Sequence, residues 1–365
     1  MKCSRNITDL PIEILDILFE CCGNMTNKLY LAQAHPYLAQ AFVYHCRNLF
    51  KHIPVYEKKS LCFWRLTLPG CGPNIKKIDR VIRENDHDAV ELVNLIALHC
   101  SKLEKIKLIF ETDSVNCVKS LICQRQNSLK AINLRLKLKL KSPEMNTKIL
   151  HELPELPLLE ELKIFNIPIE NFYHIQKFEN LVKLAIRYKN SKPVVIDILA
   201  LCAPLKKLQI LALKGVRIIA SEETKIHLPV IQLKKLNIAC EEHNSHAEVQ
   251  RFILSQGKSL ESLSHDCPRE PYRHEDFLEV IRTCRNLRFF ELPSGGVVFD
   301  LEFVEEIVDI LRHNGFTPDN PLVIMARDRP RYTKLVKWLK NSSSPELIKP
   351  EYFRYWPTRL NNDFP

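Results

Sequence analysis

Few residues in this chain of 365 stand at spacings that support chemistry of their own. Cys240, His243 and His246 lie close together and offer thiolate and imidazole ligands, but structural zinc sites favour paired Cys-x-x-Cys ligands or Cys with a distant His pair. A solvated loop after a strand is the simpler interpretation of this segment. The chain has 8 glycines and contains neither a Gly-x-Ser-x-Gly elbow nor a His-Glu-x-x-His helix. We therefore expect no catalytic residue, no cofactor and no metal, so that any enzymatic outcome must come from a bound partner.

The cysteines follow a pattern that indicates packing. Three of them stand three residues before a leucine, as Cys100 before Leu103, Cys202 before Leu205 and Cys284 before Leu287. A thiol that recurs at one repeat position is expected to be a small buried hydrophobe, not a nucleophile. The total of 13 cysteines is odd and irregularly spaced, which fits a reducing compartment better than a disulfide framework. We expect a cytoplasmic or nuclear location, or both, and no association with a membrane.

The elements that would carry these cysteines repeat along the chain. Segments of the form Leu-x-x-Leu-x-Leu begin 22 to 30 residues apart. Their first anchors are Leu103, Leu129, Leu159, Leu181, Leu205, Leu233, Leu260 and Leu287. Helix-like stretches lie near them, at residues 89–99, 115–126, 194–202, 247–256, 277–284 and 303–312. A short strand alternating with a helix every 20 to 29 residues or so resembles the leucine-rich repeat, in which each unit buries its anchors against its neighbours. An ordinary α/β sheet with chance spacing is the alternative.

The first fifty or so residues form a separate helical pattern. Leu10, Ile14, Ile17 and Leu18 have the spacing of one helical face, with Asp9 as a possible cap and Pro11 in the first turn. Further apolar positions continue to about residue 53. A segment of this size is close to the lower limit for burying a core unaided, so we expect it to complete its core against a neighbour. A helical cap on the array that follows is one interpretation.

A second interpretation comes from a resemblance. Residues 7–53 resemble the F-box, the helical module that docks substrate receptors on the Skp-family adaptor of cullin-RING ubiquitin ligases. The stretch Leu10-Pro11-x-Glu13-Ile14-Leu15-x-x-Leu18 carries most of it. The resemblance implies that the adaptor-facing residues are Leu10, Pro11, Ile14, Leu15, Leu18, Leu31 and Phe50. Phe50 stands where most F-boxes have Trp, and the segment 23–27 is looser than usual.

The repeats predict a basic surface. Alternate side chains of a strand face opposite sides of a sheet, so every second residue after an anchor is expected on the concave face. The basic residues at these positions are Lys105, Lys107, Arg135, Lys163, Lys183, Arg187, Lys207 and Lys235. Only Glu161 opposes them before the last two repeats. With a net charge of +10, this bias favours an acidic or phosphorylated target, although lysines on half-exposed strands also serve solubility. The lack of interleaved aromatic residues disfavours nucleic acid.

Together these observations predict an α/β chain with four parts. They are an F-box at 1–53, a linker at 54–74, a leucine-rich-repeat horseshoe with a concave parallel sheet and outer helices at 75–320, and a C-terminal cap and tail at 321–365. The resemblance implies a non-catalytic substrate-recognition subunit of an SCF-type E3 ubiquitin ligase, bound to the adaptor and its cullin complex. Two alternatives stay open, a non-degradative leucine-rich-repeat scaffold and a nucleic-acid-binding repeat protein.

Overall fold

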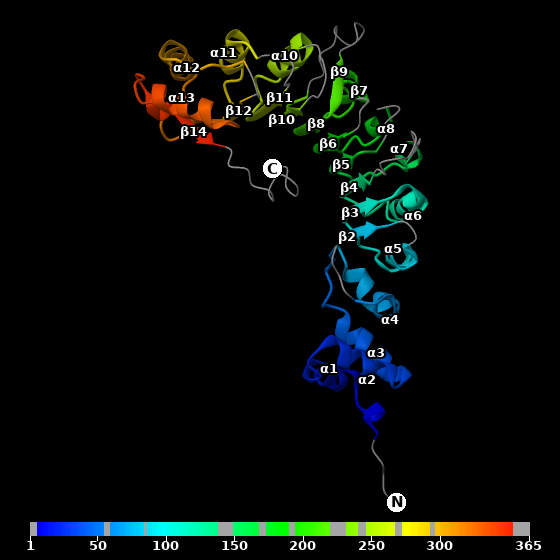
Figure 1. The fold of residues 1–365 in the computed structure, drawn as a ribbon. Helices are drawn as coiled ribbons and strands as arrows, with labels where there is room; N and C mark the ends of the chain where they lie inside the picture. The colour runs from blue at the N-terminus through cyan, green and yellow to red at the C-terminus, as the bar shows by residue number, and fades with distance from the viewer. Residues whose placement is uncertain are drawn as a thin grey trace, which may run out of the picture. The chain divides into compact units, whose positions relative to one another are not determined.

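The structure is a computed structural model that describes residues 6–54, 59–83, 86–137, 149–167, 173–189, 194–219, 231–239, 246–266, 272–292 and 296–352. The chain divides into two compact units, Met1–Pro168 and Ile169–Pro365, called unit 1 and unit 2 below. Each unit combines parallel strands with helices that cover one face of its sheet (Figure 1). The prediction of an α/β chain with a parallel sheet is therefore confirmed.

Unit 1 begins with helices and continues with alternating strands and helices. Its elements are η1 Ile7–Asp9, α1 Ile12–Cys21, α2 Met25–Gln33, α3 Pro36–Cys46, β1 His52–Ile53, α4 Leu61–Cys71, η2 Gly72–Asn74, β2 Lys77–Ile82, α5 His87–His99, β3 Lys105–Phe110, η3 Thr112–Ser114, α6 Val115–Gln124, β4 Ala131–Leu136, α7 Ile149–Glu152 and β5 Glu161–Phe165. Its five strands pair in chain order, and every pair is parallel.

The first three helices form what we call the N-terminal bundle. Helix α3 contacts α1, α2 and α4. Phe19 and Phe42 are fully buried, with ring centroids 5.4 Å apart. The bundle also holds a polar group, because His45 is buried with its Nδ1 2.7 Å from Asp16 Oδ1 and its Nε2 3.0 Å from Lys28 Nζ. The ammonium of Lys28 can only donate, so Nε2 is the acceptor and Nδ1 carries the proton that Asp16 accepts.

Residues 54–74 were predicted to be a linker, and part of this segment is instead a helix. Phe63, Trp64 and Leu68 of α4 are buried, and Ser60 caps the helix by accepting a hydrogen bond from Phe63 N at 3.3 Å. Helix α4 packs on α3 and α5, so it joins the bundle to the first repeat as one core. The apolar side chains of α4 have no repeat phase to mark them, which is why the repeat pattern did not reveal the helix.

Unit 2 continues the alternation of strand and helix. Its elements are α8 Tyr173–Gln176, β6 Lys183–Arg187, β7 Val194–Asp197, α9 Ile198–Cys202, β8 Ile210–Lys214, β9 Val216–Ile219, β10 Lys235–Ala239, α10 His246–Ser255, β11 Ser262–Asp266, α11 His274–Thr283, β12 Phe289–Glu291, α12 Leu301–His313, β13 Leu322–Ala326, α13 Arg329–Leu339, η5 Pro345–Leu347 and β14 Ile348–Tyr352. Its main sheet has the order β6-β8-β10-β11-β12-β13-β14 and is parallel throughout.

Two segments of unit 2 differ from the sequence prediction. Residues 194–202 were expected to be one helix, but the first four form β7, which pairs with β9 in a small second sheet. Val194, Val195 and Ile196 are β-branched and favour a strand over a helix. Residues 321–365 were predicted to be a cap and tail outside the repeat phase, with a last strand at 322–325 and a helix at 331–340. Strand β13 and helix α13 lie at these places, and β14 extends the main sheet beyond them. Residues 353–365 lie outside the described residues.

One repeat has a different phase from the predicted one. Leu211 of β8 pairs with Leu184 on one side and Leu236 on the other. The anchor that matches Leu181 and Leu233 is therefore Leu208, not Leu205, because each anchor lies three residues before its paired strand position. Leu205 is also fully buried, in a turn where Leu208 N donates to Leu205 O at 3.0 Å. An additional three-residue turn before the strand accounts for the shift.

Candidate binding surfaces

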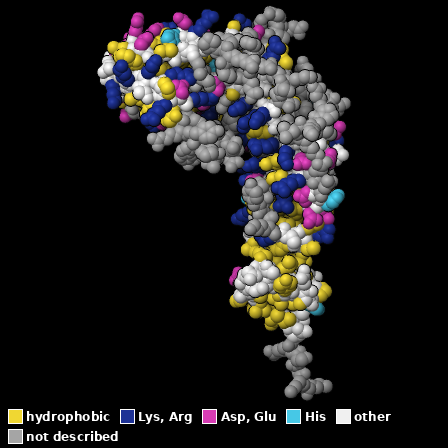
Figure 2. Space-filling model, viewed as in Figure 1, with side chains coloured by type: hydrophobic (Ala, Val, Ile, Leu, Met, Phe, Trp, Pro, Cys, Tyr) yellow, Lys and Arg dark blue, Asp and Glu magenta, His cyan; other side chains and the backbone are white. Residues whose placement is uncertain are grey.

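Helix α1 separates its apolar residues between the core and the surface. Leu15 is 1% exposed and faces the bundle core, whereas Ile14 and Ile17 are 43% and 55% exposed. Pro11 is exposed at the start of the helix, and Leu18 is half-buried. Positions i and i+3 lie on the same side of a helix, so Ile14 and Ile17 form one outward ridge. Figure 2 shows hydrophobic side chains gathered over the visible face of the N-terminal bundle.

Of the predicted adaptor-facing residues, Leu15 is buried and Phe50 is partly covered by neighbouring side chains. The side chain of Leu15 fills the core because the i+4 residue Phe19 lies on the same buried face. Phe50 is half-buried and packs edge-on against Phe63 and Trp64, with ring centroids 5.8 Å and 5.4 Å away. Lys59 Nζ lies 4.7 Å from the centre of the Phe50 ring. Leu10, Leu18 and Leu31 are half-buried, and of these Leu18 lies in α1 on the same side as Ile14. The accessible ridge is therefore Pro11, Ile14, Ile17 and the exposed part of Leu18.

The predicted basic residues of unit 1 lie on the sheet face opposite the helices, which we call the open face. Lys107 of β3 pairs in register with Asp79 of β2 and with Asn133 of β4, and Asn133 pairs with Lys163 of β5. Lys105 is exposed, while Lys107, Arg135 and Lys163 are half-buried. Figure 2 shows Lys and Arg side chains over these strands, with acidic side chains beside them.

Counter-charges on the open face of unit 1 are more numerous than the repeats predicted. Asp79 is 9% exposed and lies 3.3 Å from Lys77 Nζ and 3.4 Å from His52 Nε2. Lys163 is paired with Glu161 at 2.8 Å. Asp79 was not among the predicted residues, because the predicted anchors begin at Leu103 and β2 lies before them. The unit 1 surface is therefore a mixed-charge surface with a basic excess.

In unit 2, Lys183, Arg187 and Lys235 lie on the open face. Lys183 is exposed, Arg187 is half-buried, and both belong to β6. Lys207 does not lie there, because β8 begins only at Ile210. Its side chain instead donates a hydrogen bond from Nζ to Asn180 Oδ1 at 2.6 Å. The basic residue that β8 contributes to the open face is Lys214, which pairs in register with Arg187.

The last strands of unit 2 carry an ionic network on the open face. Arg327 Nε donates to Glu291 Oε1 at 2.6 Å, and Arg327 also pairs with Asp266. Ser264 Oγ donates to Glu291 Oε2 at 2.5 Å. Burial raises the pKa of Glu291 and lowers the pKa of Arg327. The basic residues predicted for the earlier strands are therefore replaced in the last two predicted repeats by Ser264, Asp266 and Glu291.

The repeat cysteines lie in environments that suppress their chemistry. Cys100, Cys202 and Cys284 are at most 1% exposed. Burial raises the pKa of Cys100 and of Cys284 to about 12, and it raises that of Cys202 further. A thiol with so high a pKa is not a thiolate at neutral pH and is no nucleophile. The segment with Cys240 and His243 lies outside the described residues, and no cluster of three or more metal-ligating side chains occurs within them.

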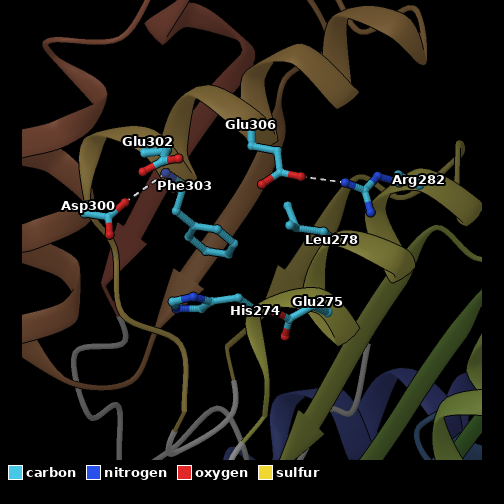
Figure 3. Close-up of a pocket in the computed structure, with 8 residues that line it drawn as sticks. All are labelled: His274, Glu275, Leu278, Arg282, Asp300, Glu302, Phe303 and Glu306. Carbon is cyan, nitrogen blue, oxygen red and sulfur yellow. Dashed lines mark hydrogen bonds and ion pairs between the residues drawn. The ribbon is translucent and has the colours of Figure 1, made fainter.

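A pocket of about 370 Å³ lies on the helical face of unit 2, between α11 and α12 (Figure 3). Its polar groups have structural roles. His274 stacks on Phe303 with ring centroids 4.3 Å apart, and its Nε2 accepts a hydrogen bond from Val298 N at 3.1 Å. Arg282 is paired with Glu306 at 2.5 Å, and Asp300 caps α12. The imidazole is fixed as an acceptor, so this pocket holds no free acid-base pair involving His274.

Comparison with known proteins adds little to these observations. No family model matches the chain, and no curated protein matches it. Among the described residues, none belongs to a helix with the length and apolar character needed to cross a membrane. A solved structure of an internalin from Listeria monocytogenes aligns with 83% of this chain and 97% of its own, at 12% identity and a TM-score of 0.40. The described parallel strands with helices on one face resemble a leucine-rich-repeat fold.

Proposed function

We propose that this protein is the substrate-recognition subunit of an SCF-type ubiquitin ligase. The observation that carries the proposal is the outward apolar ridge of α1, formed by Pro11, Ile14, Ile17 and Leu18, on a bundle that precedes a repeat array. Contiguous exposed apolar patches mark interaction sites, and Figure 2 shows apolar side chains gathered over this bundle. The F-box resemblance of residues 7–53 names the Skp-family adaptor as the partner for that ridge.

In this proposal the two parts of the molecule bind different partners. The N-terminal bundle binds the adaptor, and the open faces of the repeats bind a target protein. Ubiquitin transfer is then performed by a conjugating enzyme that the cullin complex recruits. In this proposal the chain holds the target close to the conjugating enzyme. Its repeat cysteines are not nucleophiles, because burial raises the pKa of each thiol.

Recombinant Skp-family adaptor tests the docking directly. Burial of an isoleucine side chain stabilises a complex by about 1.5 to 3 kcal/mol, so Ile14→Asp with Ile17→Asp is expected to weaken adaptor binding by at least about a hundredfold. Both residues are exposed, so the bundle keeps its core. Leu98→Asp is the matched control, because Leu98 of α5 is 66% exposed and lies outside the bundle. Calorimetry or co-purification provides the measurement.

The outcome also separates the proposal from the scaffold alternative. If the intact chain does not bind the adaptor at all, the F-box assignment is wrong and the repeats act as a scaffold. If the adaptor binds equally well to the double variant, docking uses another surface of the bundle. Leu15→Asp is a poor probe by comparison, because Leu15 is buried and an aspartate there would unfold the bundle.

A further inference from the structure

A second basic surface lies on unit 2, away from the open face. A pocket of about 580 Å³ is lined by residues that immediately precede β8, β10 and β11. Four of these residues are lysines, namely Lys206, Lys207, Lys234 and Lys258. Glu261 is the one carboxylate among the residues that line it. We call this the edge pocket.

The strand register builds the edge pocket. Leu208, Leu233 and Leu260 occupy equivalent places before their strands and are at most 1% exposed. These buried side chains fix the backbone beneath the pocket. The residues on either side of each leucine point outward. Backbone hydrogen bonds of 2.8 Å from Lys234 N to Gln209 O and from Glu261 N to Lys234 O hold neighbouring rows together. Rows in a parallel sheet are about 4.8 Å apart, so side chains from three repeats face one space.

The lysines of the edge pocket are only partly neutralised. Lys234 Nζ lies 3.9 Å from Glu261 Oε1, which is a long ion pair. Lys207 donates to the neutral amide of Asn180 at 2.6 Å. Lys206 and Lys258 are exposed, and neither forms an ion pair with a described residue. Asn286 Nδ2 donates to the backbone oxygen of Lys258 at 2.8 Å and so fixes the position of that residue.

The corresponding edge of unit 1 has a carboxylate between two of its lysines. The residues just before β2, β3 and β4 are Lys76, Glu104 and Lys130. Glu104 lies 3.5 Å from Lys76 Nζ and 3.7 Å from Lys130 Nζ. One carboxylate therefore pairs with both of these lysines, whereas in the edge pocket Lys206 and Lys258 have no such partner among the described residues.

We propose that the edge pocket binds a phosphorylated segment of a partner protein. Lysine ammonium groups are good point-charge ligands for phosphate, and the amides of Gln209 and Gln232 with the hydroxyl of Ser259 supply neutral donors. A phosphoserine carries close to two negative charges and three acceptor oxygens, which suits several donors that converge on one space. The pocket has no aromatic side chain on which a nucleobase could stack. The proposal names a class of target for the proposed function and does not depend on adaptor docking.

Fluorescence anisotropy on the full chain tests this site with a defined probe. The probe is a fluorescein-labelled Gly/Ser peptide with two phosphoserines, and its unphosphorylated twin is the reference. Lys206→Glu with Lys258→Glu is expected to weaken binding of the phosphopeptide by about tenfold or more. Lys51→Glu with Lys102→Glu is the matched control, because both lysines are exposed on unit 1 and the charge change is the same. The control is expected to bind within about twofold of the unchanged chain.

Three results would overturn the proposal. They are equal binding of the phosphopeptide and its twin, equal loss in the pocket and control variants, or tighter binding of a thymidine oligonucleotide that displaces the phosphopeptide. The last result would assign the pocket to nucleic acid. If the glutamate variant melts at a lower temperature, Lys206→Gln with Lys258→Gln must reproduce the loss. Adaptor binding is measured separately on the same proteins, so failure of the edge pocket and failure of the F-box assignment give different results.

Discussion

At the scale of single residues, neighbouring apolar side chains in α1 have different roles. Leu15 and Ile17 are two positions apart and differ in exposure from 1% to 55%. The difference arises from helical geometry, because residues two positions apart point to different sides of a helix.

Alanine substitutions at these two positions should separate core from surface. Leu15→Ala removes buried methyl groups and leaves a cavity, so the free energy of unfolding of the bundle is expected to fall by about 2 to 5 kcal/mol. Ile17→Ala should change it by less than about 0.5 kcal/mol. Urea unfolding followed by circular dichroism gives both values. A large loss of stability for Ile17→Ala would show that the ridge is part of the core.

The buried thiols give a prediction about pH. The pKa of Cys100 and of Cys284 is raised from 9.0 to about 12 by burial, so both thiols stay protonated in the folded protein where an unfolded chain would ionise them. Their contribution to stability is complete below about pH 9 and is lost as the pH rises toward 12. In native protein at pH 8, iodoacetamide should modify the exposed Cys21 and Cys62 and spare these two thiols. Mass spectrometry of the peptides identifies which cysteines are modified.

At the scale of elements, α4 has the largest effect on the architecture of unit 1. Trp64 is fully buried and contacts Phe63 and Phe50 with ring centroids 5.2 Å and 5.4 Å away. Helix α4 contacts both α3 and α5, so the packing of the bundle continues beyond residue 53. The expectation that the bundle completes its core against a neighbour agrees with this contact.

Truncation of Trp64 should therefore destabilise the first repeats as well as the bundle. Trp64→Ala is expected to cost about 3 to 5 kcal/mol, because a large buried ring is removed, whereas Trp64→Phe should cost clearly less. Hydrogen exchange is the appropriate measurement, with protection lost in both α3 and α5. Loss confined to α3 would mean that the bundle and the repeats unfold independently.

At the scale of the whole molecule, the net charge of +10 is distributed over surfaces with different degrees of pairing. On unit 1, Asp79 and Glu161 pair with lysines of the open face. On unit 2, Lys183 is exposed at the start of β6, and Arg187 lies at its end. Charges that are already paired gain less from a new acidic partner than charges that face water.

Charge reversal tests which open face attracts an acidic target. Lys183→Glu with Arg187→Glu is expected to weaken binding of a poly-glutamate probe by about tenfold and to flatten its dependence on salt. Lys105→Glu with Lys163→Glu on unit 1 should have a smaller effect, since Lys163 is already paired with Glu161 at 2.8 Å. Anisotropy titrations at several salt concentrations compare the two. Equal indifference of both variants would reject the open faces as acidic-partner sites.

The sequence by itself determined the type of most repeat elements and most of the repeat spacing, although β7 and α4 were not predicted. Anchor leucines must be buried for a short strand to be stable, so Leu103, Leu129 and Leu233 were recognisable from their spacing alone. The phase of β8 was left open by the sequence, because Leu205-x-x-Leu208-x-Ile210 and Leu208-x-x-Leu211-x-Leu213 both fit the repeat. Both leucines satisfy the pattern locally, and only pairing with β6 and β10 selects between them.

The tertiary structure decided how side chains from different repeats combine. Lys207 was predicted on the open face but lies at the edge pocket with Lys206, Lys234 and Lys258, because an additional turn precedes β8. The pairing of Arg327 with Asp266 and Glu291 joins residues of three repeats and follows from strand register. Periodicity along one chain specifies which face a residue occupies within its own strand. The neighbours of that residue across strands depend on register and on inserted turns, which the spacing alone did not fix for β8.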